Sequence, residues 1–253
     1  MKSIAYLLIL FITAQLSAQR IVINYTNVYD IKVPMTRKSK IVIDPTERKA
    51  TYFEDFKSTK MVGTDNRNVE NQAIASVKRS LDKFYVTDAQ CGRILYDNFA
   101  SANYIVKDTL AISDWNIEDT TKMIANYKAY RATCTFRGRK WIAWFTPEIP
   151  FPFGPWKLCG LPGIILEAHD ENKQWNYIVS TINLNSEDNI ILPDIQDFKS
   201  LSLEGFVKLK DEFYTNFFNS IDQNERDATI KSKTNLRAGV ESSFEWEKNN
   251  NTK

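Results

Sequence analysis

The sequence is poor in the residues from which metal sites and phosphate loops are built. It has a single histidine, His169, and its three cysteines show no Cys-x-x-Cys spacing, so a zinc site made of protein side chains is not expected. Only 8 of the 253 residues are glycine, and neither a glycine-rich phosphate loop nor a Gly-x-Ser-x-Gly motif occurs. We therefore predict no metal and no cofactor.

Long apolar runs and an excess of one charge are also missing. Lysine and arginine together number 33, against 31 aspartate and glutamate residues, and no basic stripe stands out, so we predict no nucleic-acid partner. After residue 18, no apolar run approaches the roughly 20 residues that span a bilayer. Aromatic residues, by contrast, make up 13% of the chain, which favours a curved sheet with a broad apolar face to cover or to hold a ligand.

The N-terminus has the pattern of a signal peptide. Lys2 precedes a short apolar core at residues 4–13, and Leu16-Ser17-Ala18 offers small residues before a cut. No cysteine occurs in the first 90 residues, so a lipid anchor at the cut is not expected. The alternative interpretation is a buried N-terminal helix. We expect cleavage after Ala18 and export, with a periplasmic or outer-membrane-associated location and no transmembrane segment in the mature chain.

Alternating and β-branched segments dominate the rest of the chain. Strands are expected at residues 20–33, 40–44, 49–56, 93–99, 103–108, 130–137, 140–145, 163–169 and 175–183. Gly138 and residues 170–174 are expected at hairpin turns. Four prolines between residues 147 and 155 exclude a helix or an interior strand there. The polar residues 66–83 fit either a weak helix or a long loop.

The C-terminal part has a different period. From Ser202, a plausible N-cap, the apolar positions follow helical spacing at Phe206, Leu209, Phe213, Phe217 and Ile221. Residues 222–238 are polar, and residues 239–253 are expected to be frayed or disordered at their end. We predict a mainly β, α+β fold: a curved antiparallel sheet or half-barrel with helices across its open side. The expected divisions are a signal peptide at 1–18, a β-rich domain at 19–222, and a polar helical or disordered tail at 223–253.

The strongest local pattern lies in residues 136–170. It contains Gly160-Leu161-Pro162-Gly163-Ile164-Ile165, preceded by Gly138-Arg139, Ala143-Trp144-Phe145-Thr146, Glu148-Ile149-Pro150 and Gly154-Pro155-Trp156-Lys157. Together with Trp115, Thr121-Lys122 and Tyr127, this pattern resembles the GLPGLI family of exported proteins from Bacteroidetes, also called the Porph_ging family. The resemblance covers about residues 20–220 and implies a place in the cell envelope, with a link to outer-membrane transport as a looser expectation.

The chain departs from the family pattern in two places. Members often have a cysteine in the stretch that is Tyr127-Lys128-Ala129-Tyr130 here, and many end in Asn-Pro. A disulfide from that cysteine to Cys134 therefore cannot form in this chain. Any partner contact made by the Asn-Pro ending is not expected either.

The motif allows a structural and a functional interpretation. In the structural one, Gly160, Leu161, Pro162 and Gly163 form a tight corner, Gly154-Pro155 form a second, and Trp144 and Trp156 pack over them. In the functional one, the motif is the rim of a binding groove. The candidate ligand or partner surface comprises Trp144, Phe145, Arg139 and Phe153. Arg137 and Arg139 beside Gly138 are expected to be solvated charges, although they could hold an anion.

Two kinds of catalytic site can be drawn from the remaining residues. A thiol enzyme would use Cys159 with His169 as base, and Asp170 or Glu167 as orienter. A hydrolase would pair the carboxylates Glu148, Glu167 and Asp170. The simpler interpretation is a solvated His169, isolated surface acids and one disulfide. Three cysteine pairings are open in an oxidising compartment, and Cys134–Cys159 is a candidate.

Three functions remain as hypotheses. The first, which we favour, is an exported non-enzymatic binding or accessory protein that acts with an outer-membrane transport or assembly system, or with a hydrophobic or peptide ligand. It predicts an apolar cavity beneath the aromatic residues 141–156. The second is a periplasmic hydrolase or thiol enzyme, which predicts Cys159 and His169 within hydrogen-bonding reach. The third is a structural partner module, which predicts an exposed apolar stripe on the helix at 202–238 and no cavity.

Overall fold

The computed structural model describes residues 19–62, 83–109, 112, 114–188, 194–224 and 239–248. The expected signal peptide, most of the polar segment 66–83 and residues 225–238 lie outside these ranges. Among the described residues, no helix combines the length and the apolar character needed to cross a membrane.

Strands make up most of the described chain. They are β1 Arg20–Tyr29, β2 Met35–Asp44, β3 Lys49–Met61, β4 Phe84–Asp88, β5 Arg93–Phe99, β6 Ala102–Asp108, β7 Asn116–Ile124, β8 Tyr127–Phe136, β9 Arg139–Thr146, β10 Ile164–Asp170, β11 Trp175–Ser186 and β12 Lys199–Ser202. The two helices in the described ranges are α1 Leu203–Asn224 and α2 Glu245–Lys248. The prediction of a mainly β protein with a helix from residue 202 is confirmed.

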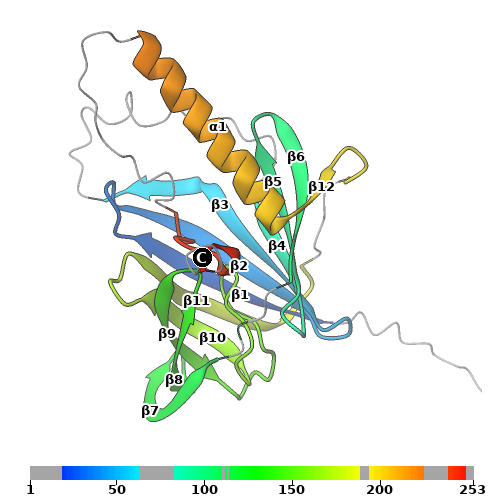
Figure 1. The fold of residues 1–253 in the computed structure, drawn as a ribbon. Helices are drawn as coiled ribbons and strands as arrows, with labels where there is room; N and C mark the ends of the chain where they lie inside the picture. Colours follow the sequence, from blue (N-terminus) through cyan, green and yellow to red (C-terminus); the bar gives the residue numbers. More distant parts are fainter. Residues whose placement is uncertain are drawn as a thin grey trace, which may run out of the picture.

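The strands form one large open sheet in the order β12-β6-β5-β4-β3-β2-β1-β11-β10-β9-β8-β7. All neighbours are antiparallel except β12 and β6, which are parallel. The prediction of a wholly antiparallel sheet is therefore wrong at this edge. The parallel pair arises from a crossover connection. After β11, near the middle of the sheet, the chain passes to the edge formed by β6, adds β12 there and then enters α1 (Figure 1).

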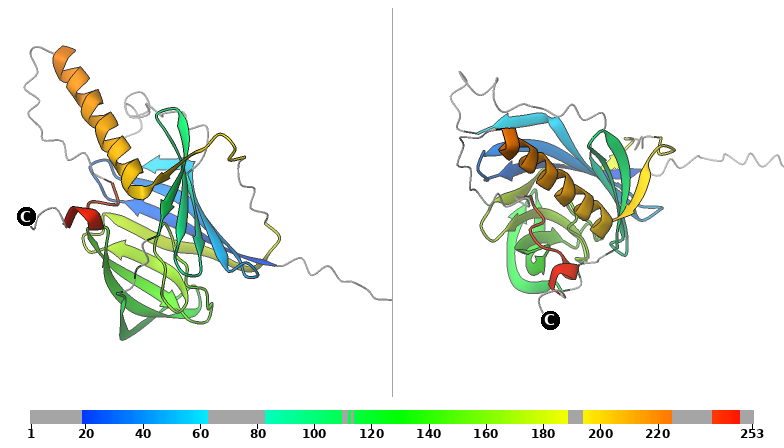
Figure 2. Two further views of the ribbon diagram at one scale, coloured as in Figure 1. Left: turned by 45° about the vertical axis from the view of Figure 1, so that its right-hand side comes forward. Right: turned by 45° about the horizontal axis from the view of Figure 1, so that its top comes forward.

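The sheet is strongly bent, and α1 lies over its concave side (Figures 1 and 2). Register shifts occur between β1 and β11, between β2 and β3, and between β9 and β10. Such bulges increase the local twist and bend the strand that carries them. They therefore contribute to the bend of the sheet.

Two hairpin turns are each formed by two successive residues with positive φ. Arg137 and Gly138 have φ values of 53° and 79°, and Ala125 and Asn126 have φ values of 48° and 69°. Two successive residues with positive φ form the turn whose twist matches that of the flanking strands. The predicted hairpin at Gly138 is confirmed, and the turn fixes where Arg137 and Arg139 leave the sheet.

The start of α1 also follows the prediction. Ser202 Oγ accepts a hydrogen bond from the Gly205 amide at 3.1 Å, as an N-cap does. Leu203, Phe206 and Val207 are buried, and the Phe206 ring lies 5.3 Å from that of Tyr104 on β6. The first two turns of α1 thus close the core on the concave side of the sheet.

Candidate functional site

The motif residues 160–163 form a corner that only glycine allows. Gly160 has a φ of 100°, a value that side chains with a Cβ rarely adopt. A Cβ on Gly163 would lie within 3 Å of the Thr146 carbonyl oxygen, closer than real Cβ atoms approach. Leu161 between them is 1% exposed. The corner holds the chain against the end of β9 before β10 begins.

The aromatic residues of the motif region serve the core. Trp141, Phe145, Phe153 and Trp156 are all at most 5% exposed. The rings of Trp141 and Trp156 lie 5.4 Å apart. Tight packing therefore accounts for these residues, including Phe145 and Phe153 of the predicted ligand surface.

Trp144 is the partly exposed member of this set. The Lys122 ammonium lies 4.5 Å from the centre of its ring, and Lys122 also pairs with Glu167. This arrangement is a cation–π contact on the outer face of the sheet. Trp144 is thus covered by a neighbouring side chain of β7.

The cysteines pair differently from the candidate named above. Cys91 and Cys159 form a disulfide, with Cα atoms 6.0 Å apart, and Cys134 is a buried free thiol. The candidate pair Cys134–Cys159 is wrong, because Cys159 is bonded to Cys91 and Cys134 of β8 is buried among core residues. Burial raises the pKa of Cys134 to about 12, so this thiol is protonated and unreactive at neutral pH.

The disulfide ties the β4–β5 turn to the motif corner. Trp115 Nε1 donates to the Cys159 carbonyl at 2.9 Å, and an Arg93 guanidinium nitrogen lies 3.1 Å from the Lys157 carbonyl. The disulfide and these hydrogen bonds thereby connect the β4–β5 part of the sheet to the segment that precedes β10. Cys159 has no free thiolate and cannot act as a nucleophile while the disulfide is intact.

The three carboxylates of the hydrolase hypothesis each contact a different basic residue or amide. Glu148 accepts from the Lys128 amide at 2.9 Å, Glu167 pairs with Lys122, and Asp170 pairs with Arg139 at 2.9 Å. His169 lies in β10, with Nδ1 2.9 Å from the Asp170 carbonyl oxygen. Each group has a separate structural partner, which does not favour the hydrolase hypothesis.

A cluster of buried charges lies at the edge of the core. Lys157, Arg93 and Arg137 are 1%, 2% and 3% exposed, and Asp108 at the end of β6 is 3% exposed. The Asp108 carboxylate lies 2.8 Å from Arg137, 2.9 Å from Lys157 and 3.7 Å from Arg93. The sheet and its turns therefore place three cations around one carboxylate.

The other two anions of the cluster come from the C-terminal segment, by which we mean residues 239–248. Glu241 lies 2.7 Å from Lys157 and 3.7 Å from Arg137, and Glu245 lies 3.1 Å from Arg137. These two glutamates balance the cluster at three positive and three negative charges. The expectation that Arg137 is a solvated charge is wrong, because the C-terminal segment covers it.

The cluster sets the ionisation of its members. Burial alone would raise the pKa of Asp108, but Lys157, Arg93 and Arg137 lower it, and the net pKa lies below the ordinary carboxyl value. Burial lowers the pKa of Arg93, and Asp108 opposes that shift. Asp108 is therefore a carboxylate at neutral pH, held in place by its charged neighbours.

Further contacts hold the C-terminal segment. Arg139 donates to the Val240 carbonyl at 2.8 Å and to the Gly239 carbonyl at 3.0 Å. Phe244 is 4% exposed, and its ring stacks on Trp246 at 4.6 Å. These contacts hold residues 239–248 against the sheet, and the end that was expected to be frayed or disordered lies outside the described residues. Arg139, predicted as a ligand or partner surface, binds this segment instead.

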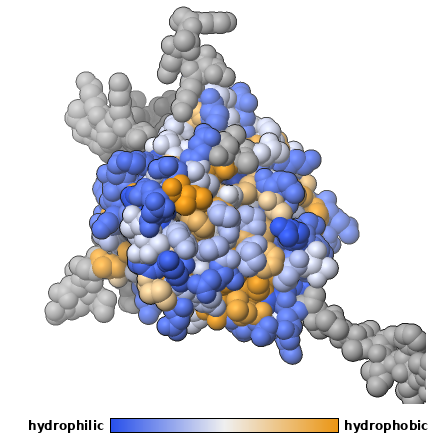
Figure 3. All heavy atoms as spheres, turned by 90° about the horizontal axis from the view of Figure 1, so that it is seen from below, coloured by the Kyte–Doolittle hydropathy of each residue, from blue (hydrophilic) through white to orange (hydrophobic). Residues whose placement is uncertain are grey.

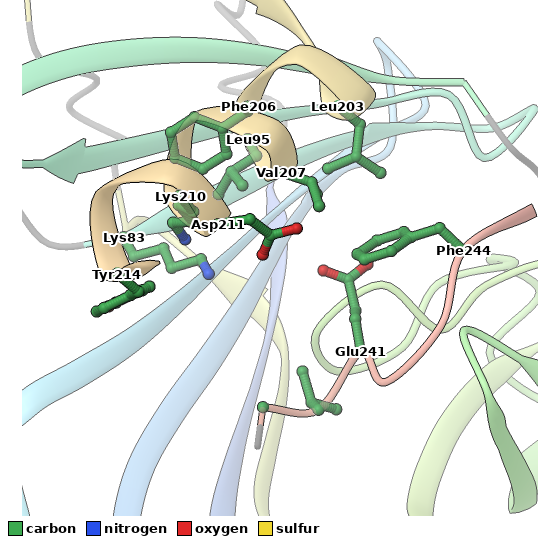
Figure 4. A pocket seen from close by; sticks show the side chains of 12 residues that line it. Lys83, Leu95, Leu203, Phe206, Val207, Lys210, Asp211, Tyr214, Glu241 and Phe244 are labelled. Atoms are coloured by element: carbon green, nitrogen blue, oxygen red, sulfur yellow. The ribbon is translucent and has the colours of Figure 1, made fainter. Parts of the chain in front are cut away.

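A cavity of about 340 Å³ lies between α1, the C-terminal segment and the sheet (Figure 4). Its walls are Lys83, Leu95, Leu203, Phe206, Val207, Lys210, Asp211, Tyr214, Gly239, Val240, Glu241 and Phe244. Phe244 and Glu241 face the helix side chains across this space (Figure 4). The cavity is not beneath the aromatics of residues 141–156, where the binding hypothesis expected it, because those side chains fill their own space.

The cavity has an apolar part and a charged part. Leu95, Leu203, Val207 and other apolar side chains form one portion of the wall, and Lys83 and Lys210 lie at its charged side. Both lysines approach the buried Asp97, at 3.7 and 3.5 Å. This arrangement suits an amphipathic ligand better than a purely apolar one.

The exposed surface offers a second, weaker feature. On α1, Phe213 and Phe217 are 43% and 51% exposed, beyond the turns that cover the core. On the face shown in Figure 3, hydrophobic residues occur in small groups separated by hydrophilic ones. The partner-module hypothesis predicts an exposed apolar stripe without a cavity, whereas here the apolar helix residues and a cavity occur together.

Comparison with known proteins bears on the motif region first. The sequence model of Porph_ging, described as a protein of unknown function, matches residues 137–167. The resemblance of this segment to the GLPGLI or Porph_ging family is therefore confirmed. No curated protein matches the chain.

Solved structures resemble the fold at low sequence identity. One is PNGF-II in its P21 space group, with a TM-score of 0.50, 14% identity, and coverage of 76% of this chain and 33% of that chain. The chain thus spans about a third of the length of PNGF-II, and the likeness concerns the fold alone.

Two further structures are less similar. An uncharacterized conserved protein from Thermus thermophilus gives a TM-score of 0.35 at 9% identity, and a LolA superfamily protein from Nitrosomonas europaea gives 0.28 at 10% identity. They cover 74% and 72% of this chain, and the match covers 91% of each of them. A TM-score below 0.5 does not establish a common fold, so these two likenesses support no inference about function.

Proposed function

We propose that this protein is an exported, non-enzymatic binding protein of the cell envelope that holds an amphipathic ligand between α1 and the concave face of the sheet. The observation that carries the proposal is the cavity of about 340 Å³ bounded by α1, β5 and the C-terminal segment. Cavities that bind small molecules in proteins usually have volumes of about 300–1,000 Å³ and mostly apolar walls with a few placed polar groups.

The composition of the wall supports a ligand with an apolar body and a polar end. Phe206 and Val207 of α1 and Phe244 of the C-terminal segment present apolar surface. Lys83 and Lys210 supply positive charge, and Lys210 also lies 4.6 Å from the centre of the Phe206 ring. A ligand with an acyl or aromatic body and a polar end would meet both kinds of wall.

The compartment is part of the same proposal. The signal-peptide pattern of residues 1–18 and the Cys91–Cys159 disulfide both fit an oxidising space outside the cytoplasm. The open curved sheet under α1 supports this proposal. The partner of the protein in delivery or uptake would be an outer-membrane transport or assembly system. The exposed Phe213 and Phe217 on α1 are a suitable place for such a partner to dock.

The test uses 8-anilinonaphthalene-1-sulfonate, an anionic probe with an apolar body whose fluorescence rises on binding. The substitution Val207→Trp should weaken probe binding by about 10-fold, because the larger side chain on α1 fills the cavity. A tenfold loss corresponds to ~1.4 kcal/mol of binding free energy. The matched control is Met123→Trp on β7, where the side chain is 67% exposed and outside the cavity.

The result needs both variants to be folded, which circular dichroism and the melting temperature establish. Equal probe binding by Val207→Trp, Met123→Trp and the unmodified chain would contradict the proposal. Native mass spectrometry of the mature protein purified from its own envelope then identifies any co-purified lipid or peptide.

A further inference from the structure

The buried charge cluster has an unusual origin, because two of its three anions belong to one short C-terminal segment. Arg93 comes from β5, Arg137 from the β8–β9 turn, and Lys157 from the connection to β10. Asp108, at the end of β6, is the carboxylate of the sheet that pairs with all three of these cations. Without residues 239–248, the three cations would share the Asp108 carboxylate as their one anion among the described residues.

Excess charge at this depth requires an anion. The side chains of Arg93, Arg137 and Lys157 are each at most 1% exposed. Removing one partner from a buried ion pair is strongly unfavourable, because the remaining charge has lost both its water and its counterion. The three cations therefore form a site built for acidic groups, which Glu241 and Glu245 fill in this structure.

The segment that fills the site binds it largely as a peptide ligand would. One backbone hydrogen bond joins the Ser242 amide to the Arg137 carbonyl at 3.0 Å, and further polar contacts run from arginine side chains to carbonyls and carboxylates of the segment. The Arg137 guanidinium lies 5.2 Å from the centre of the Phe244 ring and 6.0 Å from that of Trp246. Acidic groups and stacked aromatic rings together recognise one arginine.

The segment is also arranged within itself for this binding. The Phe244 amide donates to the Glu247 carboxylate at 2.9 Å, which caps the single turn of α2. Glu241 and Glu245 are four residues apart on either side of Phe244, and both reach Arg137. The recognised pattern is therefore two glutamates four residues apart with an aromatic residue before the second one.

We propose that the Arg93–Arg137–Lys157 cluster is a receptor site for an acidic, aromatic peptide segment of a partner protein. The C-terminal segment occupies this site from within the same chain, and a partner segment with the same chemistry replaces it. The proposal rests on the proposed binding function, because Gly239, Val240, Glu241 and Phe244 also form one wall of the cavity. Displacement of the segment opens the cavity when the partner binds.

The experiment offers the segment back to the full chain as a separate peptide. The probe is a fluorescein-labelled peptide, GVESSFEWEK, and its control is the same peptide with glutamine at both glutamates that face the cluster. Fluorescence anisotropy measures binding to the full chain and to the full-chain variant Glu241→Gln/Glu245→Gln. In that variant the internal segment has lost the charges with which it competes.

The double variant should bind the acidic peptide at least about 10-fold more tightly than the unmodified chain does, and the glutamine peptide should bind about 10-fold more weakly than the acidic one. Phe244→Ala weakens the internal segment by a different route and should also increase peptide affinity. Adding Arg137→Met to the double variant should abolish the gain. Circular dichroism and melting temperature show that each variant is folded.

Two results would overturn the proposal. One is that neither the double variant nor Phe244→Ala, when folded, binds the acidic peptide at up to about 1 mM, a concentration that corresponds to only ~4 kcal/mol of binding free energy. The other is that acidic and glutamine peptides bind equally well. Probe fluorescence in the cavity is measured on the same samples, so loss of peptide binding with retained probe binding removes only this inference.

Discussion

The motif corner and the C-terminal segment are held in place by different physical means. At the corner, Gly160 and Gly163 allow backbone to lie against backbone, and Leu161 is enclosed. At the segment, Glu241 and Glu245 meet buried cations, with few backbone hydrogen bonds. Packing of this kind tolerates almost no added atoms, whereas charge pairing can be exchanged for another pairing of the same sign. The first region is suited to fix the fold and the second to be replaced by a ligand.

The sharpest way to test the packed region is Gly163→Ala. The new Cβ would lie within 3 Å of the Thr146 carbonyl oxygen, so β9 or the corner has to move. We expect a loss of about 4 kcal/mol or more in the free energy of unfolding, the range of the most severe single substitutions. Urea denaturation followed by tryptophan fluorescence measures it.

Gly239→Ala in the C-terminal segment is the matched control for that substitution. A Cβ at Gly239 meets nothing within 4 Å, so the free energy of unfolding should change by less than about 0.5 kcal/mol. Similar losses in the two glycine variants would show that the corner is no more tightly packed than the segment.

The same contrast explains what the sequence could predict. Strands, hairpins and the start of α1 depend on neighbouring residues: Gly138 in a positive-φ turn and Ser202 at the N-cap are local signals. The motif corner is likewise contained in a short stretch. The alternating residues 130–137 predicted a strand, and β8 confirms it.

The charge cluster could not be predicted in that way, because its members come from distant parts of the chain. Asp108 and Arg137 are 29 residues apart, and Lys157 and Glu241 are 84 apart. A charged residue beside a turn is usually solvated, so Arg137 looked ordinary in the sequence. The pairing of Cys91 with Cys159 over 68 residues was hidden for the same reason. Arg93 and Asp108 are cross-strand neighbours in β5 and β6, whereas the fold of the whole sheet brings Asp108 to Arg137, because β6 and β8 lie near opposite ends of the strand order.

The charged region is tested most strongly at its centre by Asp108→Asn. Asparagine keeps the size of the side chain but leaves Lys157, Arg137 and Arg93 without the carboxylate they share. We expect a loss of about 3 kcal/mol in the free energy of unfolding at neutral pH, as for other broken buried ion pairs. Urea denaturation of the unmodified chain and the variant measures the difference.

The difference in unfolding free energy between the unmodified chain and Asp108→Asn should decrease as the pH falls. The pKa of Asp108 is lowered in the folded protein, so its stabilisation is complete above the ordinary carboxyl pKa of about 3.9 and is lost as the pH falls through the lower folded value. The gap between the two chains should therefore be constant from neutral pH down to about pH 5 and narrow below about pH 4. A gap that widens on acidification would contradict the assigned role of Asp108.

The smallest expected effects separate the two glutamates of the C-terminal segment. The Glu241 side chain is 19% exposed and pairs with both Lys157 and Arg137, whereas that of Glu245 is 42% exposed and pairs with Arg137 alone. Glu241→Gln should cost about 2 kcal/mol of unfolding free energy, as does the loss of a charged hydrogen bond in a buried setting. Glu245→Gln should cost about 0.5 kcal/mol, because water screens that pair.

Denaturation at low and at high salt distinguishes the two ion-pair contributions. Salt should reduce the effect of Glu245→Gln more than that of Glu241→Gln. Equal costs with equal salt dependence would mean that the segment is held by Phe244 and its backbone contacts rather than by charge, and the contrast with the motif corner would then disappear.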